Sequence, residues 1–171
     1  MFHESIVLFG SMQKDGKIFL CGDDDKLSTV KEYKGIAPTF YGLNDTNKYY
    51  GEIIENNSEN GIKCNLHFDG KSIHVTVHAI GNHMVANAMA SVAIGKYLGM
   101  TDKEIVRGIE SYSTIGGRNN VIKTDKYTVI DDCYNANPTS TKASIDTIAN
   151  FSNPRKVCIL NNCIICFHDC M

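Results

Sequence analysis

The chain has 171 residues, of which 43% are hydrophobic, and this is enough to build one ordinary domain or parts of two. Seventeen basic and nineteen acidic residues give a formal net charge of −2, and no run of Lys or Arg marks a surface for nucleic acid or anionic lipid. No apolar stretch is long enough to span a bilayer and the N-terminus lacks a signal-peptide pattern, so we expect a monomeric cytoplasmic protein with neither membrane insertion nor nucleic-acid partners.

The seven cysteines do not indicate a disulfide framework, because their number is odd and four of them fall in the last fourteen residues. Their spacing around His168 is compatible with zinc, but zinc sites usually pair two groups of ligands across an intervening loop. We therefore favour an irregular tail over a zinc site, and we predict no metal ligands in this chain.

Residues 17–22 form a short apolar run that ends at three aspartates, which is typical of a buried strand followed by a polar turn. Apolar and polar residues alternate from Tyr49 to Ile80, which predicts a small antiparallel sheet. The sequence GKS at 70–72 is a fragment of a phosphate-binding P-loop, but Asn65 stands where that motif needs a glycine. We interpret this segment as a tight turn between two strands.

After Ile80 the apolar residues recur at helical spacing, and Gly99 closes the segment. One polar stripe follows the same helix, and its members are His83, Asn87 and Ser91. Such a stripe is most often only the solvated face of a helix. Thr101 and Glu104 form a capping-box pattern, so a second helix is expected to run to about Ser111 and to pack antiparallel to the first.

Residues 111–120 are polar and contain glycine, and we predict a linker there. A strand at about 127–130, a helix from Pro138 to about Asn150 and a strand at 156–160 follow. This order predicts a βαβ unit.

The loop IDDCYNANPTS, residues 130–140, lies where a parallel sheet usually binds ligands. Asn137 and Pro138 are explained as the start of the helix, but four polar residues are not: Asp131, Asp132, Tyr134 and Asn135. A carboxylate accepts hydrogen bonds from ribose hydroxyls, and an amide can pair with the edge of a base. Because the loop has no glycines to wrap a pyrophosphate, we expect it to bind the nucleoside end of a nucleotide.

Three motifs together resemble the Mur ligases, the ATP-dependent amide-forming enzymes of peptidoglycan synthesis. They are GNHMVANAMASVAIGKYLGM at 81–100, GGR at 116–118 and VIDDCYNANPTS at 129–140. The likeness covers most of residues 17–160. It implies an α/β fold, with residues 1–114 as the remainder of the central ATPase domain, a small antiparallel sheet plus a helix pair. Residues 115–171 are then the first βαβ unit of the Rossmann-like C-terminal domain.

The resemblance also implies a chemistry. These ligases activate a carboxylate as an acyl phosphate with ATP and Mg²⁺, and an amine then attacks it to form an amide. The form DD-x-YNANP is most similar to family members that join D-alanyl-D-alanine to UDP-N-acetylmuramoyl-tripeptide. By resemblance, Asn87 contacts adenine, Asp132 holds the ribose, and Tyr134 and Asn135 line the nucleotide pocket. An arginine in a linker is usually a solvated charge, but by resemblance Arg118 reaches the phosphates.

The chain also departs from the family pattern. The P-loop and the acidic magnesium ligand have no counterpart here, Met84 replaces an asparagine, and Ser5 stands where a metal-binding histidine is expected. We predict no catalytic residue and no ligase activity for this chain alone, as a fragment of such an enzyme. The alternatives are a catalytically inactive nucleotide-binding or scaffold module of the same fold, and a sibling ligase for another amino acid, which the YNANP sequence disfavours.

Overall fold

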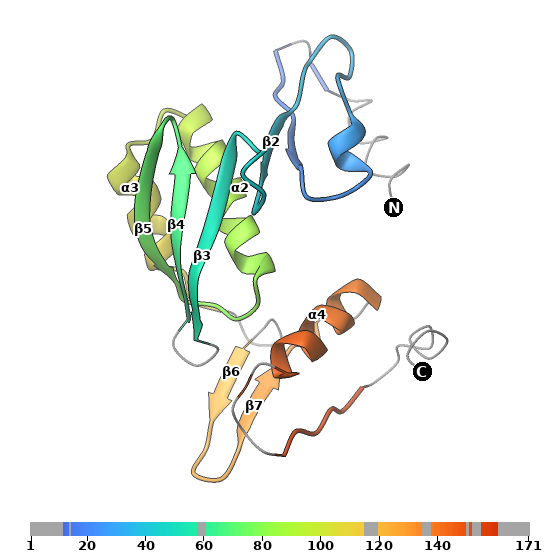
Figure 1. Ribbon diagram of the computed structural model, residues 1–171, viewed down its shortest axis with the longest axis vertical. Helices are drawn as coiled ribbons and strands as arrows, with labels where there is room; N and C mark the ends of the chain where they lie inside the picture. The colour runs from blue at the N-terminus through green and yellow to red at the C-terminus, as the bar shows by residue number, and fades with distance from the viewer. Residues whose placement is uncertain are drawn as a thin grey trace.

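The computed structural model describes residues 12–13, 15–57, 61–114, 120–134, 138–149, 151 and 155–160. A five-stranded sheet in the order β1-β2-β3-β4-β5 forms the larger part of the molecule (Figure 1). Its strands are β1 (Phe19–Cys21), β2 (Thr39–Gly42), β3 (Tyr49–Asn57), β4 (Gly61–Phe68) and β5 (Lys71–Val77). The pairs β1–β2 and β2–β3 are parallel, whereas β3–β4 and β4–β5 are antiparallel. The predicted strand at 17–22 and the antiparallel sheet are therefore confirmed.

The acidic turn after β1 stabilises the parallel part of the sheet through hydrogen bonds. The Asp23 carboxylate accepts hydrogen bonds from the backbone N–H groups of Leu43 and Asn44 and, at 2.9 Å, from the side-chain amide of Asn47. Asn47 is itself buried. One carboxylate thus links the end of β1 to the loop that follows β2, and the short helical turn η1 (Leu27–Thr29) lies between these two strands in the sequence.

Two helices cover one face of the sheet, α2 (His83–Tyr97) and α3 (Asp102–Glu110). Their apolar side chains and those of β4 and β5 form the core, and each such burial contributes about 1.5–3 kcal/mol. The largest fully buried side chains are Ile62, Cys64, Leu66, Val75, Val85, Met89 and Val92. Burial in this core raises the pKa of the Cys64 thiol to about 11. Helix α2 approaches β3 closely at Gly51, where a Cβ would lie 2.5 Å from Cγ1 of Val85.

The start of α3 and the turn between β4 and β5 have the local structure that the sequence predicts. Thr101 and Glu104 form the capping box at the start of α3, with hydrogen bonds in both directions. The residues Asp69 and Gly70 both have positive φ, 50° and 70°, and connect β4 to β5 as a tight hairpin turn. The GKS fragment is therefore part of a β-hairpin.

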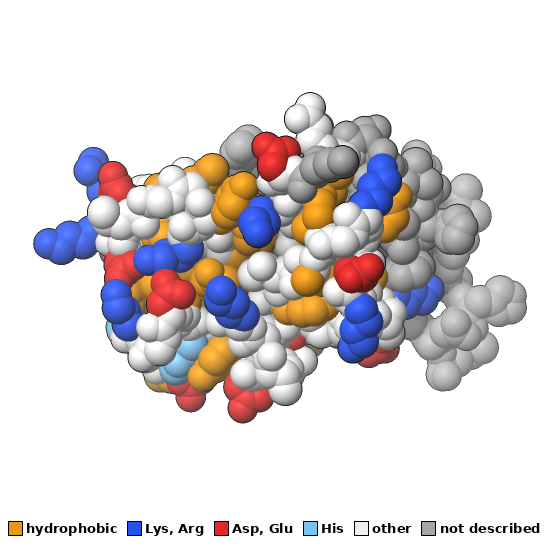
Figure 2. All heavy atoms as spheres, turned by 90° about the horizontal axis from the view of Figure 1, so that it is seen from above, with side chains coloured by type: hydrophobic (Ala, Val, Ile, Leu, Met, Phe, Trp, Pro, Cys, Tyr) orange, Lys and Arg blue, Asp and Glu red, His pale blue; other side chains and the backbone are white. Residues whose placement is uncertain are grey.

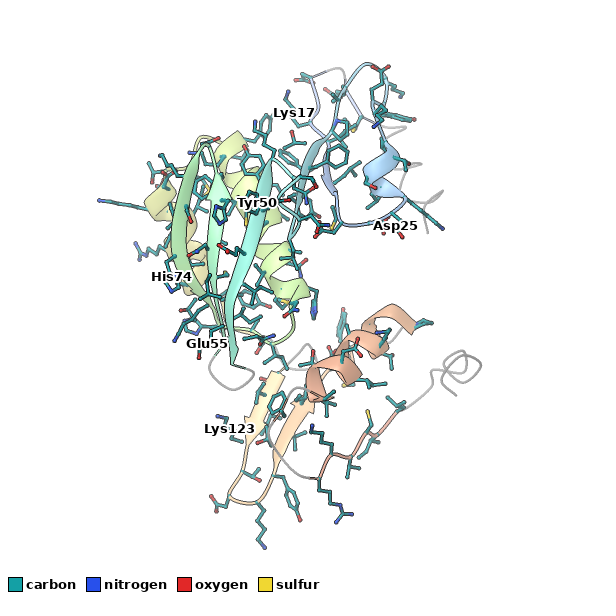
Figure 3. The ribbon with its side chains drawn as sticks, viewed as in Figure 1. Lys17, Asp25, Tyr50, Glu55, His74 and Lys123 are labelled. Carbon is teal, nitrogen blue, oxygen red and sulfur yellow. The ribbon has the colours of Figure 1, made fainter. Side chains whose placement is uncertain are left out.

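The opposite face of the sheet is polar, and in Figure 3 the side chains of Tyr50, Glu55 and His74 lie on it. The ring of Tyr50 stacks on His67 at 4.3 Å, and Nε2 of His67 lies 3.3 Å from Glu52. Seen from above in Figure 2, acidic and basic side chains alternate around small apolar patches. This mixture agrees with the near-neutral net charge.

The second part of the molecule contains a hairpin and one helix: β6 (Asn120–Lys123), β7 (Thr128–Asp131) and α4 (Pro138–Ala149). The strand predicted at 127–130 and the helix from Pro138 are confirmed, but β6 was not anticipated. The strand predicted at 156–160 is wrong, because residues 155–160 have no strand structure and are exposed. A strand needs hydrogen bonds from a neighbour; in this part of the described chain β6 and β7 pair with each other, and residues 155–160 pair with neither.

The βαβ unit is thus incomplete in the described residues, although the α/β class is correct. Residues 115–119, half of the predicted linker, and the cysteine-rich end beyond residue 160 lie outside the described residues. Within the described ranges, no helix has the length and apolar character needed to cross a bilayer.

Candidate functional site

The loop between β5 and α2 is the point where the two parts of the molecule meet. Gly81 has a φ of +89°, a conformation that favours glycine. A Cβ at this position would lie 2.6 Å from Cε1 of His83 and 3.1 Å from Oγ1 of Thr147 on α4. Thr147 is buried and donates a hydrogen bond to the Ala143 carbonyl one turn earlier. The positive φ favours glycine at this position, and the 3.1 Å distance shows how closely α4 approaches the loop before α2.

A pocket of about 210 Å³ lies at this junction. Its walls come from the end of β3, the loop before α2, the start of α2 and one face of α4, through Asn56, Gly81, Asn82, His83, Ala143, Asp146 and Thr147. The Asn56 amide donates a hydrogen bond of 2.8 Å to Oδ1 of Asn82, and this bond ties the loop to the sheet. The volume suits part of a ligand better than a whole nucleotide, since pockets for drug-sized ligands usually measure about 300–1,000 Å³.

His83 is the first residue of α2 and lines this pocket. Two influences act on its imidazole. Partial desolvation by the surrounding atoms lowers the pKa of His83 from its ordinary value of 6.5, and the negative charge of Asp132 raises it by a smaller amount. The residue itself is still largely exposed, so both effects are moderated by solvent. The charge of Asp132, which follows β7, thus acts on the first residue of α2.

Asp132 follows the last residue of β7 and is partly buried. Its Oδ2 accepts a hydrogen bond from the hydroxyl of Ser144 on α4. The neighbouring Asp131 accepts a hydrogen bond of 3.1 Å from the Cys133 thiol, and this contact raises the pKa of Cys133. The carboxylate of Asp132 is thus bonded to a residue of α4, within its own part of the molecule.

Asn87 lies one turn after His83 on the exposed face of α2. Its amide donates a weak hydrogen bond, 3.6 Å long, to the sulfur of Met84. The methionine in the place of the family asparagine therefore occupies part of the hydrogen-bonding capacity of Asn87. Tyr134 is 69% exposed on the loop after β7.

Two of the five residues predicted for the nucleotide site, Arg118 and Asn135, lie outside the described residues, as does Ser5. Of the three that are described, Asp132, Asn87 and Tyr134, none is among the residues that line the pocket. The link between Asp132 and α2 is the effect of its charge on His83. The sequence analysis did not anticipate Ser144, Gly81 or Thr147. No local pattern reveals their roles, since they act through contacts between segments far apart in the chain.

A larger, shallow hollow of about 600 Å³ runs along α3 and is lined by Ile73, Asp102, Lys103, Val106, Arg107, Glu110 and Ser111. It holds none of the residues predicted to contact a nucleotide. In the described ranges of the chain, no group of three or more His, Cys, Asp or Glu side chains is arranged to hold a metal ion.

The junction has the donor set that the nucleoside part of a nucleotide needs. A carboxylate fixed by a hydroxyl can accept hydrogen bonds from ribose hydroxyls, and the amides of Asn82 and Asn87 can donate to and accept from a base. The described residues therefore fit a nucleoside, whereas they supply no ligand set for magnesium.

The fold and this junction define a domain of the Mur ligase class, and the comparison of sequences agrees. The Mur ligase middle domain matches residues 2–95, and the chain belongs to the Mur ligase family. Among curated relatives, it is 33% identical over 141 residues to the UDP-N-acetylmuramoyl-tripeptide–D-alanyl-D-alanine ligase of Bacillus subtilis, a match that covers 81% of this chain and 29% of that protein. The enzyme of the same name from Haemophilus influenzae is 34% identical over 89% of this chain and 33% of its own length.

Solved structures give the same result. MurF from Acinetobacter baumannii superimposes with a TM-score of 0.73 at 28% identity, over 83% of this chain and 31% of that one. MurF from Thermotoga maritima, solved in complex with ADP, matches with a TM-score of 0.66 over 81% of this chain and 32% of that one. At 23% identity the second likeness shows the fold alone. The chain spans about a third of the length of these relatives.

Proposed function

We propose that this chain forms part of the adenine-nucleotide site of a Mur ligase that joins D-alanyl-D-alanine to UDP-N-acetylmuramoyl-tripeptide in peptidoglycan synthesis. The choice of substrates is supported by the two curated relatives with that name and by the YNANP sequence after the second aspartate. When bound, ATP supplies the phosphoryl group that activates the carboxylate of the peptide substrate as an acyl phosphate.

One observation carries the proposal: Asp132 stands at the end of β7, held by α4, and its charge acts on His83 at the start of α2. In this proposal Asp132 accepts hydrogen bonds from the ribose hydroxyls. Asn87 contacts adenine, Tyr134 and Asn135 line the pocket, and Arg118 reaches the phosphates. A nucleotide at this place touches both parts of the molecule, which suits a ligase that must bring its domains together around ATP.

The chain by itself is proposed to bind the nucleotide without turning it over. It spans about a third of the relatives' length, and its described residues contain no cluster that fits the magnesium ion. Without a cation-lined phosphate pocket, the charge that develops on a transferring phosphoryl group is not stabilised. In this proposal the chain alone retains only weak binding of the nucleoside part of the nucleotide.

Binding can be tested by titrating the ¹⁵N-labelled chain with ADP and following amide shifts by NMR. The proposal predicts shifts in residues 83–87 and 131–134. Asp132→Asn should weaken ADP binding by about tenfold or more, because hydrogen bonds to a charged group contribute about 1.5–3 kcal/mol. Asp25→Asn is the matched control, since Asp25 lies in the exposed acidic turn after β1 and should leave the affinity unchanged.

Equal affinities for Asp132→Asn and the unchanged chain would contradict the proposal. Shifts confined to the hollow along α3 would do the same, because that surface shares no residue with the predicted site.

A further inference from the structure

Asn82 occupies the N-cap position of α2, but its side chain does not cap the helix. An asparagine at this position usually accepts a hydrogen bond from a backbone N–H group of the first turn. Here its Oδ1 accepts a hydrogen bond of 2.8 Å from the side-chain amide of Asn56, near the end of β3. The Asn82 side chain is therefore directed toward β3, and both asparagines line the pocket at the junction.

The Asn82 amide keeps hydrogen-bonding capacity after this contact. Its carbonyl oxygen has two lone pairs and its nitrogen has two protons, and the bond from Asn56 uses one lone pair. Throughout the described ranges, the Asn56 amide is the only hydrogen-bonding partner of the Asn82 side chain. Asn82 is exposed, so both its oxygen and its nitrogen are accessible to a ligand in the pocket.

The bond from Asn56 also favours one orientation of the Asn82 amide. Because an N–H donor of Asn56 meets Oδ1, turning the Asn82 amide alone by 180° would set two NH₂ groups against each other. The buried Thr147 hydroxyl, on the α4 wall of the pocket, donates to the Ala143 carbonyl. The pocket thus presents the acceptor and the donor of Asn82 in a fixed order.

This pocket adjoins the residue that bonds Asp132. Ala143 lines the pocket, and the next residue, Ser144, donates its hydroxyl to the Asp132 carboxylate. A nucleotide whose ribose lies at Asp132 can therefore place its base in the pocket. The volume of about 210 Å³ suits this part of a nucleotide.

We propose that Asn82 selects adenine over 6-keto purines and that Asn56 orients its amide for this purpose, an inference that rests on the proposed function. Adenine presents an amino group, which donates, beside a ring nitrogen, which accepts, and an asparagine amide matches both. In hypoxanthine an oxygen replaces the amino group and N1 carries a proton. An amide held in one orientation then sets acceptor against acceptor and donor against donor, so it favours adenine.

Three alanine variants separate these roles. Asn82→Ala removes the amide at little cost to α2, because the side chain makes no capping bond. Asn56→Ala keeps Asn82 but frees its amide to turn. Asn65→Ala is the matched control, since Asn65 on β4 bonds Glu52 and His74 and is not among the pocket residues.

The experiment compares ADP with inosine diphosphate by NMR titration of the whole chain. The unchanged chain should bind ADP at least about fivefold more tightly. Asn82→Ala should lower the affinity for ADP and bring the ratio of the two affinities close to one. Asn56→Ala should lower the ratio mainly by raising the affinity for inosine diphosphate, because a freed amide can turn to match it. Asn65→Ala should leave the ratio unchanged.

A preference for ADP that survives in Asn82→Ala would overturn the inference. Loss of both affinities at a constant ratio would do so too, because it indicates a structural role. If the unchanged chain binds both nucleotides equally while Asp132→Asn still weakens ADP binding, the inference fails and the proposed function stands. If the unchanged chain does not bind ADP, both fail.

Discussion

His83 and Asp132 are the residues at which the two parts of the molecule act on each other electrostatically. Desolvation disfavours the charged imidazole, and the carboxylate favours it, with desolvation the larger effect. The other polar residues that line the same pocket include Asn56, Asn82 and Asp146, and the Asp146 carboxylate is paired with Lys142 at 2.6 Å. The pKa of His83 therefore depends on both its desolvation and the charge of Asp132.

The lowered pKa of His83 predicts how stability changes with pH. In the unfolded chain the imidazole returns to its ordinary pKa of 6.5, so the unfolded state binds more protons once the pH falls below that value. The folded state should therefore lose stability as the pH falls through 6.5 toward the lowered pKa, and this contribution should be complete above 6.5. Urea unfolding between pH 5 and pH 8 measures it, with His83→Gln as the variant that lacks the titration.

The pKa of His83 can also be used to test the influence of Asp132 directly. In Asp132→Asn the charge that raises the pKa of His83 is gone, so an NMR titration of the imidazole should give a lower pKa than in the unchanged chain. A pKa of His83 above 6.5 in the unchanged chain would show that the attraction of Asp132 exceeds desolvation, contrary to this account.

At the scale of elements, the close approach of α4 to the loop before α2 depends on Gly81. Gly81→Ala should destabilise the chain by about 1–3 kcal/mol for the positive φ, and by more for the contacts of the new Cβ with His83 and Thr147. Gly70→Ala is the matched control, because Gly70 also has positive φ but has no atom within 4 Å of a new Cβ. Urea unfolding should show a larger loss for Gly81→Ala, and equal losses would contradict the crowded junction.

The elements that the sequence predicted well are those set by neighbours in the chain. The capping box of Thr101 and Glu104 and the turn at Asp69 and Gly70 depend on residues at most three positions apart, and both were predicted. The pairing of β6 with β7 and the absence of a strand at 156–160 depend on which segments meet in space. Sequence periodicity does not specify such partners, so both were missed.

In the candidate site, too, the sequence indicated residues with a local pattern and missed those that depend on contacts between distant segments. Asp132 was predicted as a ligand-binding residue because a carboxylate after a strand and before a helix is typical of a ligand-binding corner, and this assignment stays a prediction. Ser144 was missed because a serine inside a helix has no distinctive pattern, and its role depends on a contact twelve residues away. The proximity of Asp132 to His83 joins residues 49 positions apart, and only the fold brings them together.

At the scale of the whole molecule, the second part leaves apolar surface uncovered. Val157 is 66% exposed and Ile159 is 91% exposed, and Ile122 and Val129 on the hairpin are also exposed. An uncovered apolar surface next to strand edges favours association with other chains. The chain also spans only about a third of the relatives to which it is similar.

The central claim is that an adenine nucleotide binds at the junction of α2 with β7 and α4. A crystal structure of this chain grown with ADP tests it most directly. The account predicts the ribose hydroxyls within hydrogen-bond distance of Asp132, adenine alongside Asn87, and the phosphates facing Arg118. A nucleotide bound elsewhere, or Asp132 and Arg118 on opposite sides of the molecule, would contradict it.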